Sequence, residues 1–213
     1  YEGSNPTIVG CEIASNVGAG IEAWVKQAGR NITYNYPTIS NCVVAANGGD
    51  GISGGMPTVA NCTIVANGAY GVSCIEPTVT DSIVYYNGLD TALAQIEGDL
   101  ITVSYSDIQG GWPGEGNIDA VPCFAELGFW NLGDLLDDVS DDFWVPGDYH
   151  LRSQAGRWDP SSQSWIQDVI TSSCIDAGSP ESDWTAESAP NGERINLGAF
   201  GGTPQASMSL PTE

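Results

Sequence analysis

The chain has 213 residues, and its charge is strongly one-sided: 27 Asp and Glu stand against 5 Lys and Arg, for a formal net charge of −22. A surface of this sign repels nucleic acid and anionic lipid, and it repels acidic polysaccharide unless cations intervene. No apolar run reaches the length of a membrane span, which excludes membrane insertion. The composition suits an exported protein, and we expect an extracellular or cell-surface location.

The first part of the chain is built from a repeat of twenty residues. Copies begin at Pro37, Pro57 and Pro77, and an earlier copy begins at Pro6. A period of this size is typical of a stacked, solenoidal architecture. In the second copy Val44 lies on the same face of an extended strand as its neighbours two positions away, whereas Ile39 is out of phase and requires a bend near Asn41. Several short strands per repeat, stacked one repeat per turn, predict an all-β fold, the parallel β-helix.

Stacking places equivalent residues in columns inside this β-helix. Small side chains suit a narrow interior, and stacked asparagine amides donate to one neighbour and accept from the next at a buried turn. We interpret both columns as structural and inaccessible to a ligand. The cysteine column consists of Cys11, Cys42 and Cys62, and the asparagine ladder of Asn16, Asn47, Asn67 and Asn87.

An insertion over residues 24–34 follows the first copy and leaves the solenoid as a lateral loop. It carries Trp24, Lys26, Arg30 and Tyr34, which we expect to bind a glycan or a protein partner. Lys26 and Arg30 are the only basic residues before residue 112. With calcium they could serve a polysaccharide lyase as base and carboxylate neutraliser. The competing interpretation is a loop that shields the stack or contacts a partner, as insertions in repeats usually do.

The regularity ends near residue 112, which divides the chain into β-helix rungs over 1–112 and irregular final rungs with a C-terminal cap over 113–213. Six of the seven tryptophans fall at or after Trp112. We expect the clustered aromatic residues to form the core of this end and to cover the last turn of the solenoid, because an open turn exposes apolar columns and unpaired backbone. These residues are Phe129, Trp130, Phe143, Trp144, Trp158 and Trp165. Cys123 and Cys174 are either joined by a disulfide across the final turns or left as two buried thiols.

An acidic loop between residues 133 and 148 is dense enough in carboxylates for calcium, although its spacing does not match an EF-hand. The candidate ligands are Asp134, Asp137, Asp138, Asp141, Asp142 and Asp148. The alternative is a solvated acidic loop.

The lone histidine, His150, lies near Asp148, Arg152 and Arg157. Hydrolases of this fold present paired aspartates beside a histidine and a basic residue. The regular rungs lack such a pair, because Asp50 and Asp81 stand at different offsets within their copies and stacking does not bring them together. We therefore interpret His150 as a structural residue of the C-terminal end.

Several segments together resemble the secreted right-handed parallel β-helix repeat proteins of planctomycete-like bacteria. They are the "PTISNC" type of rung and a tail that reads "YSDIQGGWPGEGNIDAVPCF", "SSCIDAGSP" and "APNGERINLGAFGGTPQASMS". The resemblance spans nearly the whole chain and implies the fold. It leaves the function open, since relatives of this fold include lyases, hydrolases, adhesins and surface fibres.

From these observations we expect a non-catalytic extracellular structural or interaction module with no required cofactor. Repeats begin almost at Tyr1, so the first rung offers open strand edges, and copies of the chain could stack head-to-tail into a surface fibre. The alternatives are a polysaccharide lyase or hydrolase, or a glycan-binding module, each acting on the lateral surface.

Overall fold

The computed structural model describes residues 5–88, 95–131 and 142–210. Within these ranges the chain forms strands, turns and loops, and it forms no helix that could cross a membrane.

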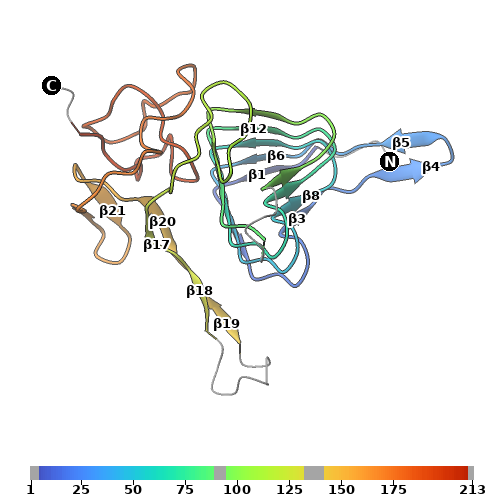
Figure 1. Ribbon diagram of the computed structural model, residues 1–213, viewed down its shortest axis with the longest axis horizontal. Helices are drawn as coiled ribbons and strands as arrows, with labels where there is room; N and C mark the ends of the chain where they lie inside the picture. The colour runs from blue at the N-terminus through green and yellow to red at the C-terminus, as the bar shows by residue number, and fades with distance from the viewer. Residues whose placement is uncertain (1–4, 89–94, 132–141, 211–213) are drawn as a thin grey trace.

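Three parallel sheets form the walls of the repeat region (Figure 1). Each of the first four rungs contributes one strand to each sheet, and the last rung contributes strands to sheets A and B among the described residues. Sheet A consists of β1 (Thr7–Val9), β6 (Thr38–Ser40), β9 (Thr58–Ala60), β12 (Thr78–Thr80) and β15 (Thr102–Ser104). Sheet B consists of β2 (Glu12–Ala14), β7 (Val43–Ala45), β10 (Thr63–Val65), β13 (Ile83–Tyr85) and β16 (Asp107–Ile108). Sheet C consists of β3 (Ile21–Glu22), β8 (Ile52–Ser53), β11 (Val72–Ser73) and β14 (Ile96–Glu97). This arrangement is the predicted parallel β-helix.

The bore of the β-helix is filled by columns of branched aliphatic side chains in exact register across the rungs. Ile39 pairs with Val59 in sheet A, and Val44 pairs with Ile64 in sheet B. The chain turns between these two sheets at Asn41, whose positive φ of 50° recurs one rung later at Asn61. Asparagine tolerates this left-handed conformation better than most residues, so the predicted bend is where the repeat places an asparagine.

The asparagine ladder runs through the corner between sheets B and C. The Nδ2 of Asn47 donates to Oδ1 of Asn67 at 2.8 Å, and the same bond joins Asn16 to Asn47 and Asn67 to Asn87. Gln95 ends the ladder by accepting from Nδ2 of Asn87 at 2.9 Å. The buried asparagines of the ladder therefore form hydrogen bonds with one another and with the backbone, which agrees with a structural role.

The outer face of sheet B is apolar and covered. Val65 and Ile83 point away from the bore and pack against Phe124, Leu151 and Leu197 of the C-terminal region. Further contacts fasten this region to the rungs. Asp81 is buried, and its carboxylate accepts from the Ser179 amide and the Ser182 hydroxyl. The C-terminal region thus lies along the side of the β-helix (Figure 1).

This lateral position corrects the prediction that the aromatic C-terminal segment caps the last turn. The segment that packs on the bore at that end is the loop after β16, through the half-buried Trp112. Asn117 fixes the loop by donating to the Val103 carbonyl at 3.0 Å and to the Trp112 carbonyl at 3.2 Å. Parallel pairing also continues past residue 112, because Asp107 bridges to Ile118.

The C-terminal region contains three antiparallel strand pairs: β17 (Phe124–Glu126) with β20 (Asp148–Leu151), β18 (Phe129–Asn131) with β19 (Phe143–Val145), and β21 (Arg157–Asp159) with β22 (Ser164–Ile166). The β18–β19 ribbon projects away from the body (Figure 1). Phe129, Trp130 and Phe143 are about half exposed on it, with exposed fractions of 52%, 46% and 54%. The prediction that these three rings form a core is wrong, because they lie half exposed on a two-stranded ribbon, where Trp130 packs only against the ring of Trp144 on the facing strand among the ring contacts of the described residues.

The six cysteines are free thiols. The disulfide considered for Cys123 and Cys174 is therefore not formed. Cys174 is fully buried and its Sγ donates to Oδ2 of Asp107 at 3.1 Å, so the thiol is directed at a carboxyl group of the last rung. In the cysteine column of the β-helix, Cys42 and Cys62 are buried as expected, whereas Cys11 is exposed.

Candidate functional site

The predicted insertion is an antiparallel hairpin that replaces the turn between sheets C and A in the first rung. It contains β4 (Lys26–Ala28) and β5 (Asn31–Thr33). The chain leaves the rung at Ala23, whose amide donates to the Ser53 carbonyl at 2.8 Å, and it returns at Asn35, whose carbonyl accepts from Met56 at 2.9 Å. The hairpin therefore rises from one specific corner of the β-helix (Figure 1).

In the next rungs the same corner forms a groove of about 380 Å³. Its lining comprises Gly54, Ser73, Cys74, Ile75, Glu97, Gly98 and Asp99. Successive rungs are held together here by backbone bonds from Gly54 to Ser73 and from Cys74 to Glu97. Gly54 has a φ of 70°, and a Cβ on it would lie 2.3 Å from the Ala23 carbonyl oxygen, so only glycine allows the rungs to approach this closely at the base of the hairpin.

The four residues predicted for glycan or partner binding all lie on the hairpin or at its base, and of the four only Tyr34 lines one of the two cavities described at this corner. Trp24 is 70% exposed and follows Ala23 directly. Lys26 pairs with Thr33 near the open end of the hairpin, whereas Arg30 lies in its turn.

Tyr34 lies where β5 returns toward the rungs, and it lines a second cavity of about 270 Å³. The other lining residues are Asn5, Ile32, Thr33 and Tyr36. The Tyr36 amide donates to Oδ1 of Asn5 at 3.3 Å, which ties the hairpin to the chain segment before β1. The hairpin thus has an aromatic cavity beside it and an acidic groove at its base, and we call the two together the corner site.

The electrostatics of the groove are negative. Burial raises the pKa of Asp50, and the nearby charge of Glu97 raises it further against the hydrogen bond from the Tyr70 amide. Burial and then the charge of Asp50 raise the pKa of Cys74 to about 12, so this thiol stays protonated and is a poor nucleophile. Ser73 donates to Oε2 of Glu97 at 3.1 Å.

The predicted calcium ligands fall mostly outside the described residues: Asp134, Asp137, Asp138 and Asp141 lie there, and Asp142 and Asp148 do not. Within the described part of the chain, no group of three or more His, Cys, Asp or Glu side chains could hold a metal ion. Asp148 has other partners. Its Oδ1 accepts from the His150 amide at 3.1 Å and contacts the His150 ring at 2.6 Å, while its Oδ2 pairs with Arg157 at 3.0 Å.

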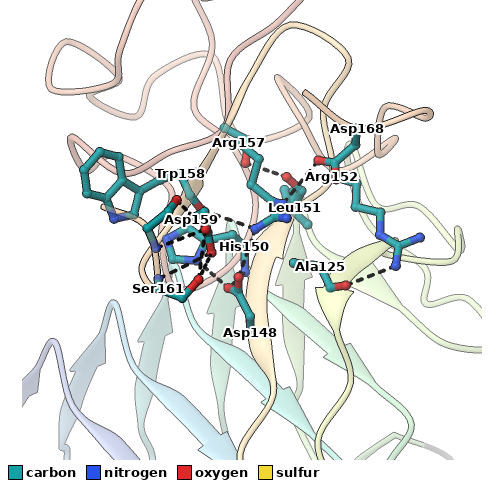
Figure 2. A network of polar contacts seen from close by, with 12 residues as sticks. Ala125, Asp148, His150, Leu151, Arg152, Arg157, Trp158, Asp159, Ser161 and Asp168 are labelled. Carbon is teal, nitrogen blue, oxygen red and sulfur yellow. Dashed lines mark hydrogen bonds and ion pairs between the residues drawn. The ribbon is translucent and has the colours of Figure 1, made fainter. Parts of the chain in front are cut away.

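His150, on β20, and Arg157, on β21, lie in one polar network through Asp148 (Figure 2). Arg157 extends the network to Asp168 through an Nε contact of 3.2 Å. Arg152 points the other way and donates to the Ala125 carbonyl at 3.0 Å. His150 is 3% exposed, and its ring stacks on Phe200 with 3.6 Å between centroids. A ligand in solvent does not reach this ring. The network therefore has a structural role: its hydrogen bonds and ion pairs connect β20, β21 and the loop that carries Asp168.

Two family models match the chain. One, described as right handed beta helix region, matches residues 1–76, and the other, described as disaggregatase related, matches residues 142–178. The second range contains β19 to β22 and the His150 network. No curated protein and no solved structure matches the chain.

The fold and the match to the right handed beta helix region together define the class of the protein, which is a right-handed parallel β-helix repeat protein. The sequence indicated the hairpin residues but not the groove. Most of the groove lining comes from turn residues of three separate rungs, and none of these residues alone indicates a binding site. The one available signal was the column at the end of sheet C, in which Glu22, Ser53, Ser73 and Glu97 stand in register.

Proposed function

We propose that this protein is a non-catalytic extracellular interaction module that binds polysaccharide at the corner site. The observation that carries the proposal is the exposed Trp24 at the base of the hairpin, which rises from the β-helix corner that forms the groove in the next rungs and carries Tyr34 of the second cavity. An indole face stacks on the apolar face of a sugar ring, and concave sites with few polar groups around such a ring are typical of small-ligand binding. The net charge of −22 favours a neutral or cationic glycan over an acidic one.

The arrangement favours binding over lyase chemistry. A lyase needs its base and its carboxylate neutraliser on the same sugar residue. Lys26 begins β4 and pairs with Thr33 across the hairpin, whereas Arg30 lies in the turn beyond Ala28, so the two side chains do not stand opposite each other on the strands. The hairpin therefore offers two isolated cations.

A glycoside hydrolase is the second candidate, and one observation supports it: Glu97 and Asp99 line the same groove. Two carboxyl groups flanking a scissile bond are the usual requirement for this chemistry. Against it, the general acid must stay protonated near neutral pH, which burial normally brings about, and both side chains are exposed. Release of reducing ends from a panel of neutral polysaccharides would establish the hydrolase.

Binding is tested by affinity electrophoresis of the full chain in gels containing neutral polysaccharides. Retardation that is lost in Trp24→Ala supports the proposal. The matched control is Trp130→Ala, which removes an exposed tryptophan from the β18–β19 ribbon, far from the corner site in sequence and fold. If Trp24→Ala and Trp130→Ala behave alike, the corner site is not the binding surface.

Head-to-tail stacking of copies through the first rung stays a separate prediction. Light scattering of the purified chain, with calcium and with chelator, distinguishes fibres from monomers. Loss of fibres in chelator would implicate the acidic loop.

A further inference from the structure

The corner groove offers a ligand many hydrogen-bond acceptors and few donors. Its polar side chains are the carboxylates of Glu97 and Asp99 and the hydroxyl of Ser73. The Ser73 hydroxyl hydrogen is directed at Glu97, at an oxygen distance of 3.1 Å. The site therefore presents negative oxygen atoms and accepts hydrogen bonds.

Four backbone amides of the groove are already engaged in hydrogen bonds within the protein. The amides of Gly54, Cys74, Ile75 and Asp99 already donate to the carbonyls of Ser73, Glu97, Gly55 and Ile75, at 2.8 to 3.0 Å. A ligand carbonyl or carboxylate entering the groove would lose its water and find no N–H group among these four in return. Such a ligand is disfavoured by the uncompensated loss of its hydrogen bonds.

Among the described residues, no ion pair joins a protein cation to Glu97 or Asp99. The ion pairs found within the described ranges all lie in the C-terminal region. Asp148 contacts His150 and Arg157, and Asp168 contacts Arg157. Lys26 and Arg30 belong to the hairpin that rises from this corner, and neither lines the groove. A metal ion is also a poor complement, since the described side chains include no cluster able to hold one. The remaining complement is an organic cation.

We propose that the groove binds the protonated amine of an amino-sugar polymer, with Glu97 and Asp99 accepting from the ammonium group. An ammonium group provides three donors and one positive charge, which matches a lining of acceptors with two negative charges. The groove volume of about 380 Å³ suits a sugar unit rather than a bare ion. This inference rests on the proposed function, because it specifies which polysaccharide the corner site takes.

Isothermal titration of the full chain with glucosamine oligomers and with N-acetylglucosamine oligomers of equal length tests the inference. The two ligands share a backbone and differ in the amine, which acetylation neutralises and converts into a carbonyl acceptor. We expect the amine form to bind about tenfold more tightly or better, given one charge-assisted hydrogen-bonded pair. Equal affinity for both ligands overturns the amine assignment and leaves polysaccharide binding intact. Binding of neither ligand counts against both proposals.

A strongly acidic protein attracts any polycation, so matched variants are needed to separate the groove from general charge. Glu97→Gln removes one charge within the groove, and Glu193→Gln removes one exposed charge in the C-terminal region. We expect the first to weaken glucosamine-oligomer binding about tenfold and the second to leave it nearly unchanged, because screened surface charges contribute little. Equal weakening by both variants, or equally tight binding of spermidine, overturns the proposal.

Discussion

Asp107 is a single side chain whose ionisation opposes folding. It is fully buried between the last rung and the C-terminal region, and its carboxyl group accepts from the Ala120 amide at 3.0 Å and from Cys174. Burial raises its pKa to about 6, and the charge of Asp119 adds to the effect. The folded state therefore holds this proton more tightly than the unfolded state. The contribution to stability is largest below the unfolded pKa of about 4 and falls as the pH rises to about 6.

Asp107→Asn should therefore stabilise the protein at neutral pH. The amide keeps an acceptor for Ala120 and removes the buried charge, so we expect a gain of about 2–3 kcal/mol at pH 8 that vanishes near pH 4. Urea denaturation across this pH range measures it, with Glu193→Gln, which removes an exposed charge outside the surroundings of Asp107, as the control. A gain that does not depend on pH would contradict the ionisation argument.

Asn67 tests the ladder at the same scale. Its side chain accepts from Nδ2 and the amide of Asn47, and it donates to Asn87 and to the Val44 carbonyl, all at 2.8 to 3.1 Å. Asn67→Ala leaves buried partners without bonds, and we expect a loss of about 3 kcal/mol or more in the free energy of unfolding. Asn16→Ala, at the exposed end of the ladder, should cost much less. Similar losses for the two variants would show that burial does not set the cost.

At the scale of the element, cross-strand tryptophan pairs hold two of the antiparallel ribbons together. Trp130 faces Trp144 with 5.8 Å between ring centroids, and Trp158 faces Trp165 with 5.6 Å. A two-stranded ribbon alone is marginal in water, so such pairs decide whether it forms. A double-mutant cycle with Trp158→Ala and Trp165→Ala should give a coupling of about 0.5–1.5 kcal/mol. Additive effects would mean that the rings stabilise the ribbon independently.

The elements also show what sequence reasoning reached. The repeat identified the rungs, the bend at Asn41, the ladder and the position of the insertion, because these follow from local periodicity and from stacking, whereas the hairpin form of the insertion came from the structure. It did not reveal the partner of sheet B. The relevant signal was present in β7, β10 and β13, where inward and outward positions are both largely apolar, as in strands buried on two faces. The tryptophan pairs and the groove depend on contacts between segments whose order in the chain does not indicate them.

At the scale of the whole molecule, two apolar layers lie on the two faces of sheet B. The bore of the β-helix and the layer outside sheet B are separate apolar clusters, with Val44 and Ile64 in the first and Val65 and Ile83 in the second. Because side chains alternate across a strand, a substitution at Val65 reaches the outer layer without entering the bore. The two layers can therefore be perturbed one at a time.

Val65→Asp should release the C-terminal region from the β-helix and leave the rungs folded. An unpaired carboxylate at a fully buried position costs several kcal/mol and lies on the face that Leu197 covers. We expect hydrogen exchange over residues 195–199 to become fast while β7 and β10 stay protected, because the rungs keep their own core and backbone ladders. Val59→Asp, directed into the bore, is the matched control and should abolish protection in both layers. If Val65→Asp also removes the protection of β7 and β10, the two layers fold as one cooperative unit, and the β-helix depends on its outer layer for stability.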